Sequence, residues 1–247
     1  MRTILTALLF FLTLQLLAQN KDPDSLKTEN PKFNYKALII PTALIGYGVI
    51  GLESHTLIGI NSDTRNELSE HIDEKFTIDD ISQYAPLASV YALNLAGIKG
   101  KSNFKDRTII LATAYLIMGA TVNSIKRTGN VERPDKTSFN SFPSGHTATA
   151  FMGAEFLYQE YKDASIWYGI SGYAVAAGTG FFRMYNNRHW LTDVAAGAGI
   201  GILSTKIAYW IHPCIKRVIF KDSKNLTGMI MPSCIDGKYG VGMAMIF

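Results

Sequence analysis

Apolar residues in this chain gather in long runs rather than alternating with polar residues. The runs recur six times between residues 37 and 211, separated by shorter polar or charged stretches. They cover residues 37–54, 84–98, 107–125, 146–160, 165–182 and 190–211. Strand-like alternation does not occur before residue 225. The pattern predicts an all-α fold with a six-helix core bundle of apolar helices.

Two further segments differ from these runs. Residues 62–76 place Leu68, Ile72 and Phe76 four positions apart, which is typical of an amphipathic helix on a protein or membrane surface. Residues 213–247 end in two short strand-like runs around Pro-Ser and Asp-Gly. They predict a C-terminal tail with a short β-hairpin.

The N-terminus has the pattern of a secretory signal peptide. Arg2 is followed by an apolar run over residues 4–17 and then by a polar stretch. This predicts a signal peptide over residues 1–18, because the run is short for an uncleaved membrane anchor, which is the alternative. Polar residues 19–35 predict a linker, and residues 36–212 the helical domain.

The composition indicates a chain in or against a membrane. Hydrophobic residues make up 47% and charged residues 18% of the chain, below the roughly 25% charged residues of soluble domains. By the positive-inside rule, the basic loop 99–107 would be cytoplasmic. A cleaved signal peptide would leave the N-terminus outside the cytoplasm, and six spans starting from there would place this loop on the opposite side of the membrane. The pattern therefore leaves open whether the helices cross the bilayer. We expect a bacterial cell-envelope protein, membrane-embedded or membrane-associated, with residues 126–143 and 183–189 facing the periplasm.

Charge and cysteine content narrow the possible partners. The net charge is +4 without Lys/Arg tracts, which argues against nucleic acid and suits anionic lipid or phosphate. Cys214 and Cys234 form no C-x-x-C motif, so a zinc or redox motif is not indicated. In an exported chain they could form a disulfide that pins the tail to the last helix, although two free thiols fit equally well.

Three polar clusters lie at predicted helix boundaries. The third is Arg183, then His189 after five intervening residues, then Asp193 four positions after the histidine. On a helix His189 and Asp193 share a face, and the carboxylate can fix the imidazole tautomer. Taken alone, this pair would more often be a plain surface pair.

The other two clusters supply an anion site. Ser144 is a plausible N-cap, Gly145 permits a tight turn, and His146 can donate a proton beside an anion at the helix start. Lys126 and Arg133 add cations, and arginine binds phosphate oxygens bidentately. Each feature alone could be a capping turn or solvated loop charges.

Together the clusters resemble the type 2 phosphatidic acid phosphatase family, within the superfamily that includes acid phosphatases and vanadium haloperoxidases. The family pattern K-x6-R-P, P-S-G-H and S-R-x5-H-x3-D stands here as Lys126 to Pro134, Pro143 to His146 and Arg183 to Asp193. Phe182 replaces the serine before Arg183. Only eight residues separate Pro134 from Pro143, which leaves little room for a substrate-specific lid.

The resemblance implies a mechanism with a phosphohistidine and no cofactor or metal. His189 would attack phosphorus, Asp193 would orient it, and His146 would act as general acid and base. The residues that would hold the phosphate are Lys126, Arg133, Ser144, Gly145 and Arg183.

We expect a metal-independent lipid phosphatase acting on a phosphate monoester or diphosphate. The candidate substrates are lipid A phosphates, phosphatidylglycerophosphate, phosphatidate and undecaprenyl diphosphate, with envelope lipids favoured by the signal peptide. A secreted acid phosphatase on soluble phosphoesters is the alternative. A vanadate-dependent haloperoxidase is disfavoured by the small size of the chain, and a decayed, non-enzymatic site by the presence of both histidines and Asp193. The sequence identifies no protein partner and no oligomeric state.

Overall fold

A computed structural model describes residues 35–70, 77–219, 227–235 and 238–246. In residues 227–246 only the backbone is described. The chain divides into two units, Met1–Lys32 and Phe33–Phe247. The predicted signal peptide and most of the predicted linker, up to residue 34, lie outside the described residues.

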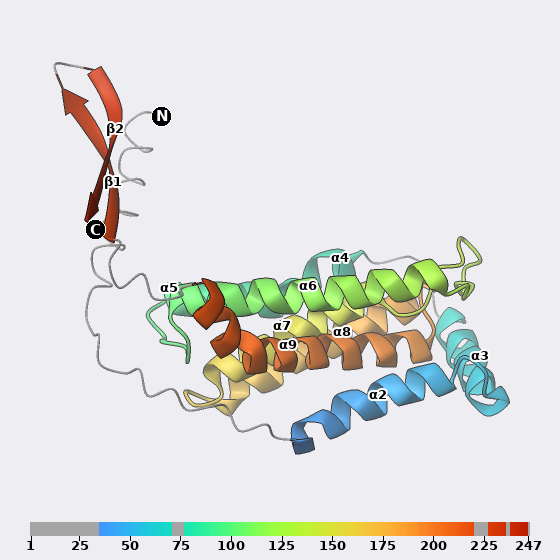
Figure 1. Ribbon diagram of the computed structural model, residues 1–247. Coiled ribbons are helices and arrows are strands. Elements are labelled where there is room, and N and C mark those ends of the chain that lie inside the picture. The colour runs from blue at the N-terminus through green and yellow to red at the C-terminus, as the bar shows by residue number, and fades with distance from the viewer. Residues whose placement is uncertain (1–34, 71–76, 220–226, 236–237, 247) are drawn as a thin grey trace. The chain divides into compact units, whose positions relative to one another are not determined.

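The described part of the chain is predominantly helical, which confirms the all-α class (Figure 1). A short 3-10 helix, η1, covers Tyr35–Leu38. The α-helices are α2 Ile39–Ile50, α3 His55–Ser69, α4 Ile78–Ser82, α5 Ala85–Leu95, α6 Phe104–Thr128, α7 Gly145–Tyr161, α8 Ile166–Tyr185 and α9 Leu191–Ile219. Helices thus occupy the apolar runs of the sequence, with ends that differ by a few residues.

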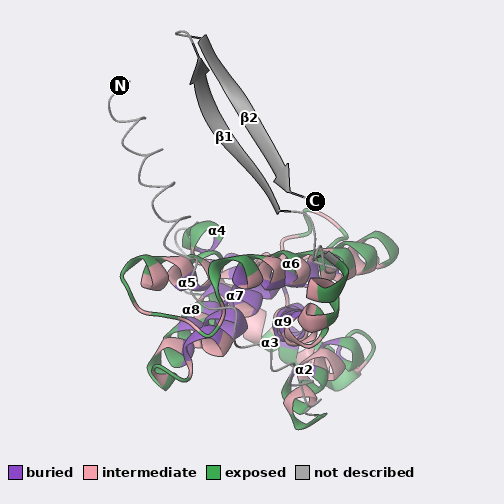
Figure 2. Ribbon diagram, turned by 60° about the vertical axis from the view of Figure 1, so that its left-hand side comes forward, coloured by how far each residue is buried: buried purple, intermediate pink, exposed green. Residues whose placement is uncertain are grey.

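Helix α7 forms the centre of the helical bundle. Its residues Ala148, Met152 and Phe156 have no exposed surface, and Figure 2 shows the buried class concentrated along α7 and α9. Helices α5, α8 and α9 pack against α7, while α2 and α6 pack against α9. Because α7 is surrounded, its N-terminal residues are held firmly at one end of the bundle.

Small residues let α7 and α9 approach each other closely. A Cβ added at Gly201 of α9 would lie 2.3 Å from the Ala148 carbonyl oxygen, and one at Gly197 would lie 2.5 Å from the Ser144 carbonyl oxygen. Glycine at these two positions is therefore required by backbone proximity. The contact at Gly197 sets the start of α7 against the first turns of α9.

The segment between α2 and α5 differs from the prediction. The run 37–54 ends as a helix at Ile50, and the chain bends by 93° into α3. The predicted helix over 62–76 begins earlier, at His55, and α3 ends at Ser69; residues 71–76 lie outside the described residues. At the bend the chain approaches α9 closely, since a Cβ at Gly51 would lie 2.3 Å from Thr192 Cγ2.

Within the described residues two helices are long and apolar enough to cross a membrane, Phe104–Thr128 and Leu191–Val218. The bent pair Tyr35–Ile50 and His55–Leu68 would add a third span if it counts as one. These criteria concern length and composition alone. They fit a membrane protein with fewer long spans than there are apolar runs.

The segment for which the sequence predicts a hairpin contains two strands. Strand β1, Thr227–Ile235, pairs antiparallel with β2, Lys238–Ile246, in a register that runs from Thr227 opposite Ile246 to Ile235 opposite Lys238. Cys214 is an exposed free cysteine in the structure. The side chain of Cys234 lies outside the described residues, so the disulfide stays a prediction.

The close α7–α9 contact predicts that Gly201→Ala destabilises the bundle. The new methyl group must displace the backbone of α7, which typically costs about 1–3 kcal/mol in the free energy of unfolding. Gly178→Ala in α8 is the matched control, since a Cβ there meets nothing within 4 Å and should be neutral or stabilising by up to about 1 kcal/mol. Thermal unfolding in detergent measures both, and equal midpoints would contradict the packing described.

Candidate active site

The three predicted clusters meet at one end of the bundle. Lys126 lies in the last turn of α6 and Arg183 in the last turn of α8, while Asp193 lies in the first turn of α9. The Ser144 backbone N–H donates to the Asp193 carbonyl oxygen at 3.0 Å, which joins the second cluster to the third. Residues far apart in the sequence therefore surround one site.

His189 and Asp193 form a buried pair. The distance from His189 Nδ1 to Asp193 Oδ2 is 3.5 Å, and both side chains are at most 2% exposed. The local structure differs from the expected shared helix face, because α9 begins only at Leu191 and His189 lies in the preceding turn. Asp193 Oδ2 accepts the Trp190 backbone N–H at 2.9 Å, so this carboxylate satisfies an N–H at the start of α9 and holds the imidazole as well.

Ser141 is a site residue that the sequence reasoning missed. Its hydroxyl donates to Asp193 Oδ2 at 2.5 Å and lies 3.4 Å from His189 Nδ1. It precedes the Pro143–His146 motif by two residues, and nothing in the motif itself points to it. Together with the Trp190 N–H it fixes the carboxylate that orients His189. Asp193 Oδ1 is buried without a hydrogen-bond partner among the described residues.

The environment keeps the His189 imidazole neutral. Burial lowers the pKa of His189 to about 4, and the Lys126 and Arg183 charges act in the same direction, whereas Asp193 opposes them. Because a carboxylate only accepts hydrogen bonds, an Nδ1–H facing Asp193 leaves the Nε2 lone pair unprotonated. A neutral imidazole with one fixed tautomer is the form that can act as a nucleophile.

The start of α7 provides a place for an anion. Ser144 is the N-cap, as predicted: its Oγ accepts the Thr147 backbone N–H at 3.5 Å and lies 2.9 Å from Thr147 Oγ1. Gly145 does not adopt a left-handed conformation. A Cβ there would meet only Val122 Cγ1, at 3.9 Å. The missing side chain leaves the first N–H groups of the helix open to a ligand.

Asn140 positions two of the cations. Lys126 Nζ donates to the Asn140 carbonyl oxygen at 2.5 Å, and Arg133 Nε donates to Asn140 Oδ1 at 3.1 Å. Burial and the neighbouring Arg183 charge lower the pKa of Arg133. Like charges held together in this way favour binding of an anion, which relieves their repulsion.

Two carboxylates on α4 contact the remaining site residues, and the sequence motifs gave no signal for them. Arg183 Nη1 donates to Asp79 Oδ2 at 2.5 Å, while Arg183 Nε is buried without a partner among the described residues. His146 Nε2 lies 2.9 Å from Asp80 Oδ1. The adjacent acids stand more than 60 residues before His146, and the fold alone brings them to the site.

Asp79 and Asp80 of α4, together with His146 of α7, have a spacing suitable for a metal ion. One ligand atom from each of Asp79, Asp80 and His146 lies within 4.8 Å of the others. The Arg183 guanidinium, however, lies 2.5 Å from Asp79 Oδ2 and 3.8 Å from Asp80 Oδ1. Its charge offsets part of the negative charge of these carboxylates and would repel a second cation. The donor set therefore fits an arginine–carboxylate network better than a metal centre.

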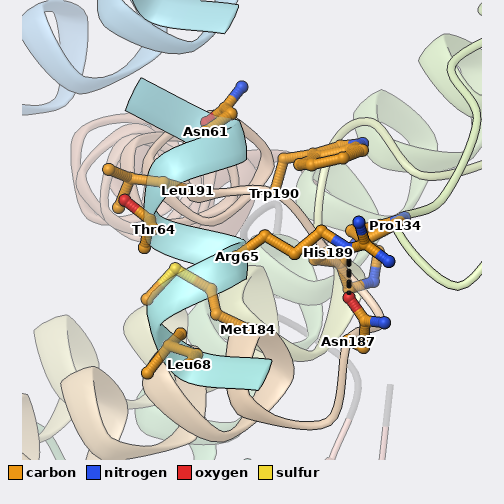
Figure 3. A pocket seen from close by; sticks show the side chains of 10 residues that line it. All are labelled: Asn61, Thr64, Arg65, Leu68, Pro134, Met184, Asn187, His189, Trp190 and Leu191. Atoms are coloured by element: carbon orange, nitrogen blue, oxygen red, sulfur yellow. Dashed lines mark hydrogen bonds between the residues drawn. The ribbon is translucent and has the colours of Figure 1, made fainter. Parts of the chain in front are cut away.

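A pocket beside His189 is walled by α3 (Figure 3). Arg65 of α3 reaches across to the turn after α8, where its Nε donates to Asn187 Oδ1 at 3.0 Å. It is a further cation near the site that no motif indicated. The pocket lining consists of Asn61, Thr64, Arg65, Leu68, Pro134, Met184, Asn187, His189, Trp190 and Leu191.

A second, largely apolar recess adjoins this pocket, with a volume of about 200 Å³. It lies at the bend between α2 and α3, and it shares Asn61 and Trp190 with the first pocket. Asn61 Nδ2 donates to Thr192 Oγ1 at 2.9 Å, which fixes α3 on the start of α9. The lining residues are Gly51, Leu52, Ile58, Asn61, Ser62, Val131, Trp190 and Thr192.

Comparison with known proteins finds similarity in the segment that carries this site. Residues 107–217, which contain all three clusters, match the PAP2 superfamily. The chain is 43% identical over 141 residues to the lipid A 1-phosphatase of Porphyromonas gingivalis, covering 57% of this chain and 32% of that protein. It is 34% identical over 74 residues to the bacitracin transport permease protein BcrC of Bacillus licheniformis, covering 30% and 34%. The segment of the chain that carries the site is therefore similar to the PAP2 superfamily.

The alignments cover about a third of the length of these two curated relatives. Among solved structures, LpxE of Aquifex aeolicus is similar with a TM-score of 0.42 and 22% identity, over 66% of this chain and 92% of that one. A transmembrane PAP2-type phosphatidylglycerolphosphate phosphatase from Bacillus subtilis is similar with a TM-score of 0.44 and 19% identity, over 72% and 98%.

The buried, neutral His189 predicts a loss of stability in acid. The folded pKa is about 4 against an ordinary value of 6.5, so the unfolded chain binds the extra proton first as the pH falls. The free energy of unfolding should therefore decrease between about pH 6.5 and 4, by on the order of 3 kcal/mol.

The control is His189→Asn, which removes the titrating group. Thermal unfolding of both proteins across this pH range should show a shallower dependence for the variant, and the comparison of slopes cancels the contribution of His146. Parallel curves would contradict the assignment of a depressed pKa to His189.

Proposed function

We propose that this protein is a metal-independent phosphatase that hydrolyses a phosphate monoester or diphosphate of an envelope lipid through a phosphohistidine. The observation that carries the proposal is a neutral, carboxylate-held His189 beside three cations and the N-terminus of α7. A nucleophile next to an anion site is what phosphoryl transfer to a side chain requires.

In the first step the Nε2 lone pair of His189 attacks phosphorus and the bond from phosphorus to the leaving oxygen breaks. His146, when protonated, transfers a proton to that oxygen, so the alcohol or phosphate leaves in its stable form. Asp193 and Ser141 keep the ring oriented, and the Asp193 carboxylate stabilises the imidazolium that develops. The product is a phosphoryl group on His189.

In the second step the neutral His146 accepts a proton from water, and the resulting hydroxide attacks phosphorus. The P–N bond breaks, the electron pair returns to His189 Nε2, and inorganic phosphate is released. Lys126, Arg133 and Arg183 bind the equatorial oxygens in both steps, where negative charge spreads in the transition state. The N–H groups at the start of α7 add to the same stabilisation.

The apolar recess at the α2–α3 bend supports a lipid as the substrate. It shares Asn61 and Trp190 with the pocket at His189, so a chain attached to a phosphate at His189 could extend into it. The surface near the bend is apolar as well, since Ile50 is 63% and Leu52 37% exposed. A soluble phosphoester would gain nothing from such a recess.

Among lipid phosphates we favour lipid A, because the relative from Porphyromonas gingivalis, which is 43% identical over the aligned segment, is a lipid A 1-phosphatase. Phosphatidylglycerophosphate, phosphatidate and undecaprenyl diphosphate remain the other candidates. A secreted acid phosphatase is the second candidate function, favoured by the N-terminal signal-peptide pattern. The long apolar helices α6 and α9 oppose it.

The remaining assignments are part of the same proposal. We place the protein in the bacterial cell envelope, with α6 and α9 spanning the membrane and the His189 end facing the periplasm. Residues 1–18 would be removed as a signal peptide, residues 19–35 would be a linker, and 36–212 would form the phosphatase domain. Residues 213–247 would form a tail with a β-hairpin, and the domain would consist of six core helices.

Phosphate release from lipid phosphates and soluble esters, measured with EDTA present, tests the chemistry. The wild type should be active, and His189→Ala should lose at least about 10³-fold in turnover, since the nucleophile is gone. Radiolabelled substrate should label the wild type with an acid-labile, base-stable phosphoryl group. Inhibition by EDTA, or activity in the variant, would refute the mechanism.

The recess can be tested with a matched pair of substitutions in α3. Ile58 lines the recess and is 43% exposed, whereas Ile60 lies outside it and is 39% exposed. Ile58→Trp should raise KM for long-chain lipid phosphates by about tenfold and leave short-chain soluble esters unaffected, because the indole fills the space. Ile60→Trp should change neither, and an equal effect of the two variants would argue for the soluble-ester function.

A further inference from the structure

Helix α4 lies outside the segment that matches the PAP2 superfamily, yet its two carboxylates reach both sides of the site. Asp79 is 1% exposed, and the Asp80 side chain is 58% exposed. The pair lies in α4, before α5 and before residue 107, where the matched segment begins, so no family motif assigns a role to it.

The two carboxylates have separate partners. Asp79 accepts Arg183 Nη1 at its Oδ2 and Asn186 Nδ2 at its Oδ1, at 2.5 and 3.0 Å. Both of its oxygens are therefore used, and its contacts fix one nitrogen of the guanidinium and leave the others for a ligand. Asp80 instead faces His146, at 2.9 Å, and lies 3.8 Å from Arg183 Nη1.

We propose that Asp80 is a positioning residue that holds His146 in one orientation and one tautomer for acid–base catalysis. An ionised carboxylate can only accept, so the contact places the proton on Nε2 and leaves Nδ1 to exchange a proton with the leaving group and with water. The site then contains two histidine–carboxylate pairs. The His189 pair is buried, and the His146 pair lies at the partly exposed edge of the site.

The charges around His146 determine how Asp80 affects the pKa of this histidine. Burial and the Arg183 charge lower the pKa of His146, while Asp80 and, more weakly, Asp79 raise it. Without Asp80 the imidazole would face the arginine and lose its proton at lower pH. His146 must be protonated to donate to the leaving oxygen, so Asp80 extends activity toward higher pH.

This inference rests on the proposed phosphatase function, and the variant that tests it is Asp80→Asn. We expect kcat on an alkyl or lipid phosphate to fall by about tenfold to a hundredfold, within the range for weakening a general acid, with KM little changed. The basic limb of the pH profile should move to lower pH. A substrate with a good leaving group, 4-nitrophenyl phosphate, should be much less affected because it needs no proton.

Two further variants separate positioning from a structural role. Asp80→Glu should restore part of the rate, and Asp80→Asn should have no additional effect when His146 is already alanine. Asp163→Asn is the control, since it removes the same charge from an exposed turn after α7. Equal losses on both leaving groups without a shift of the basic limb would overturn the proposal, as would a gain in activity, which would make Asp80 an obstruction.

A histidine-selective NMR titration tests the contact without turnover, so failure of the phosphatase function and failure of this proposal can be told apart. The pKa of His146 should be lower in Asp80→Asn than in the wild type, with the His146→Ala spectrum providing the assignment. An unchanged pKa would refute the positioning role. A shift on adding Mg²⁺ or Mn²⁺, absent in Asp80→Asn, would assign the cluster to a cation and likewise overturn it.

Discussion

The buried carboxylate of Asp193 is the group on which the rest of the site depends. Its side chain is fully buried, and one oxygen accepts the Ser141 hydroxyl and the Trp190 backbone N–H beside His189 Nδ1. The same residue accepts the Ser144 N–H through its carbonyl oxygen. A buried charge is costly unless such partners surround it. The partners come from the loop before α7 and the start of α9, so the carboxylate joins the elements that carry both histidines.

Helix packing makes this arrangement possible. Gly197 and Gly201 allow α9 to lie against the backbone of α7, which brings the starts of the two helices to the same end of the bundle. Both N-termini then contribute N–H groups and positive potential at one place, where Lys126, Arg133 and Arg183 add full charges. The interior of the bundle is buried, whereas α3 and α4 lie beside the site and complete its walls.

Much of this could be predicted from the sequence because the signals were local. The apolar runs marked the helices, Ser144 had the residue type of an N-cap, and the spacing of Lys126, Arg133, His146, Arg183, His189 and Asp193 identified the clusters that the fold brings together. The features that the sequence did not reveal depend instead on contacts between residues far apart in the chain. The run through Gly51 gave no sign of a 93° bend, which lies where the chain meets Thr192 of α9. Ser141, Asp79 and Asp80 were missed since their roles arise from tertiary contacts.

The residues proposed to carry out the reaction and those proposed to adjust its pH dependence lie in different parts of the chain. Helix α4 precedes the motifs but contacts His146 and Arg183. The proposed nucleophile, its carboxylate and the proposed phosphate ligands lie within the matched segment, but the acids that face His146 and Arg183 are encoded before it. Under the proposed mechanism, substitutions in α4 would therefore alter the working pH of the protein while every motif residue stayed the same. Relatives with identical motifs need not share an acidity optimum, and the difference would be found in the segment that precedes α5.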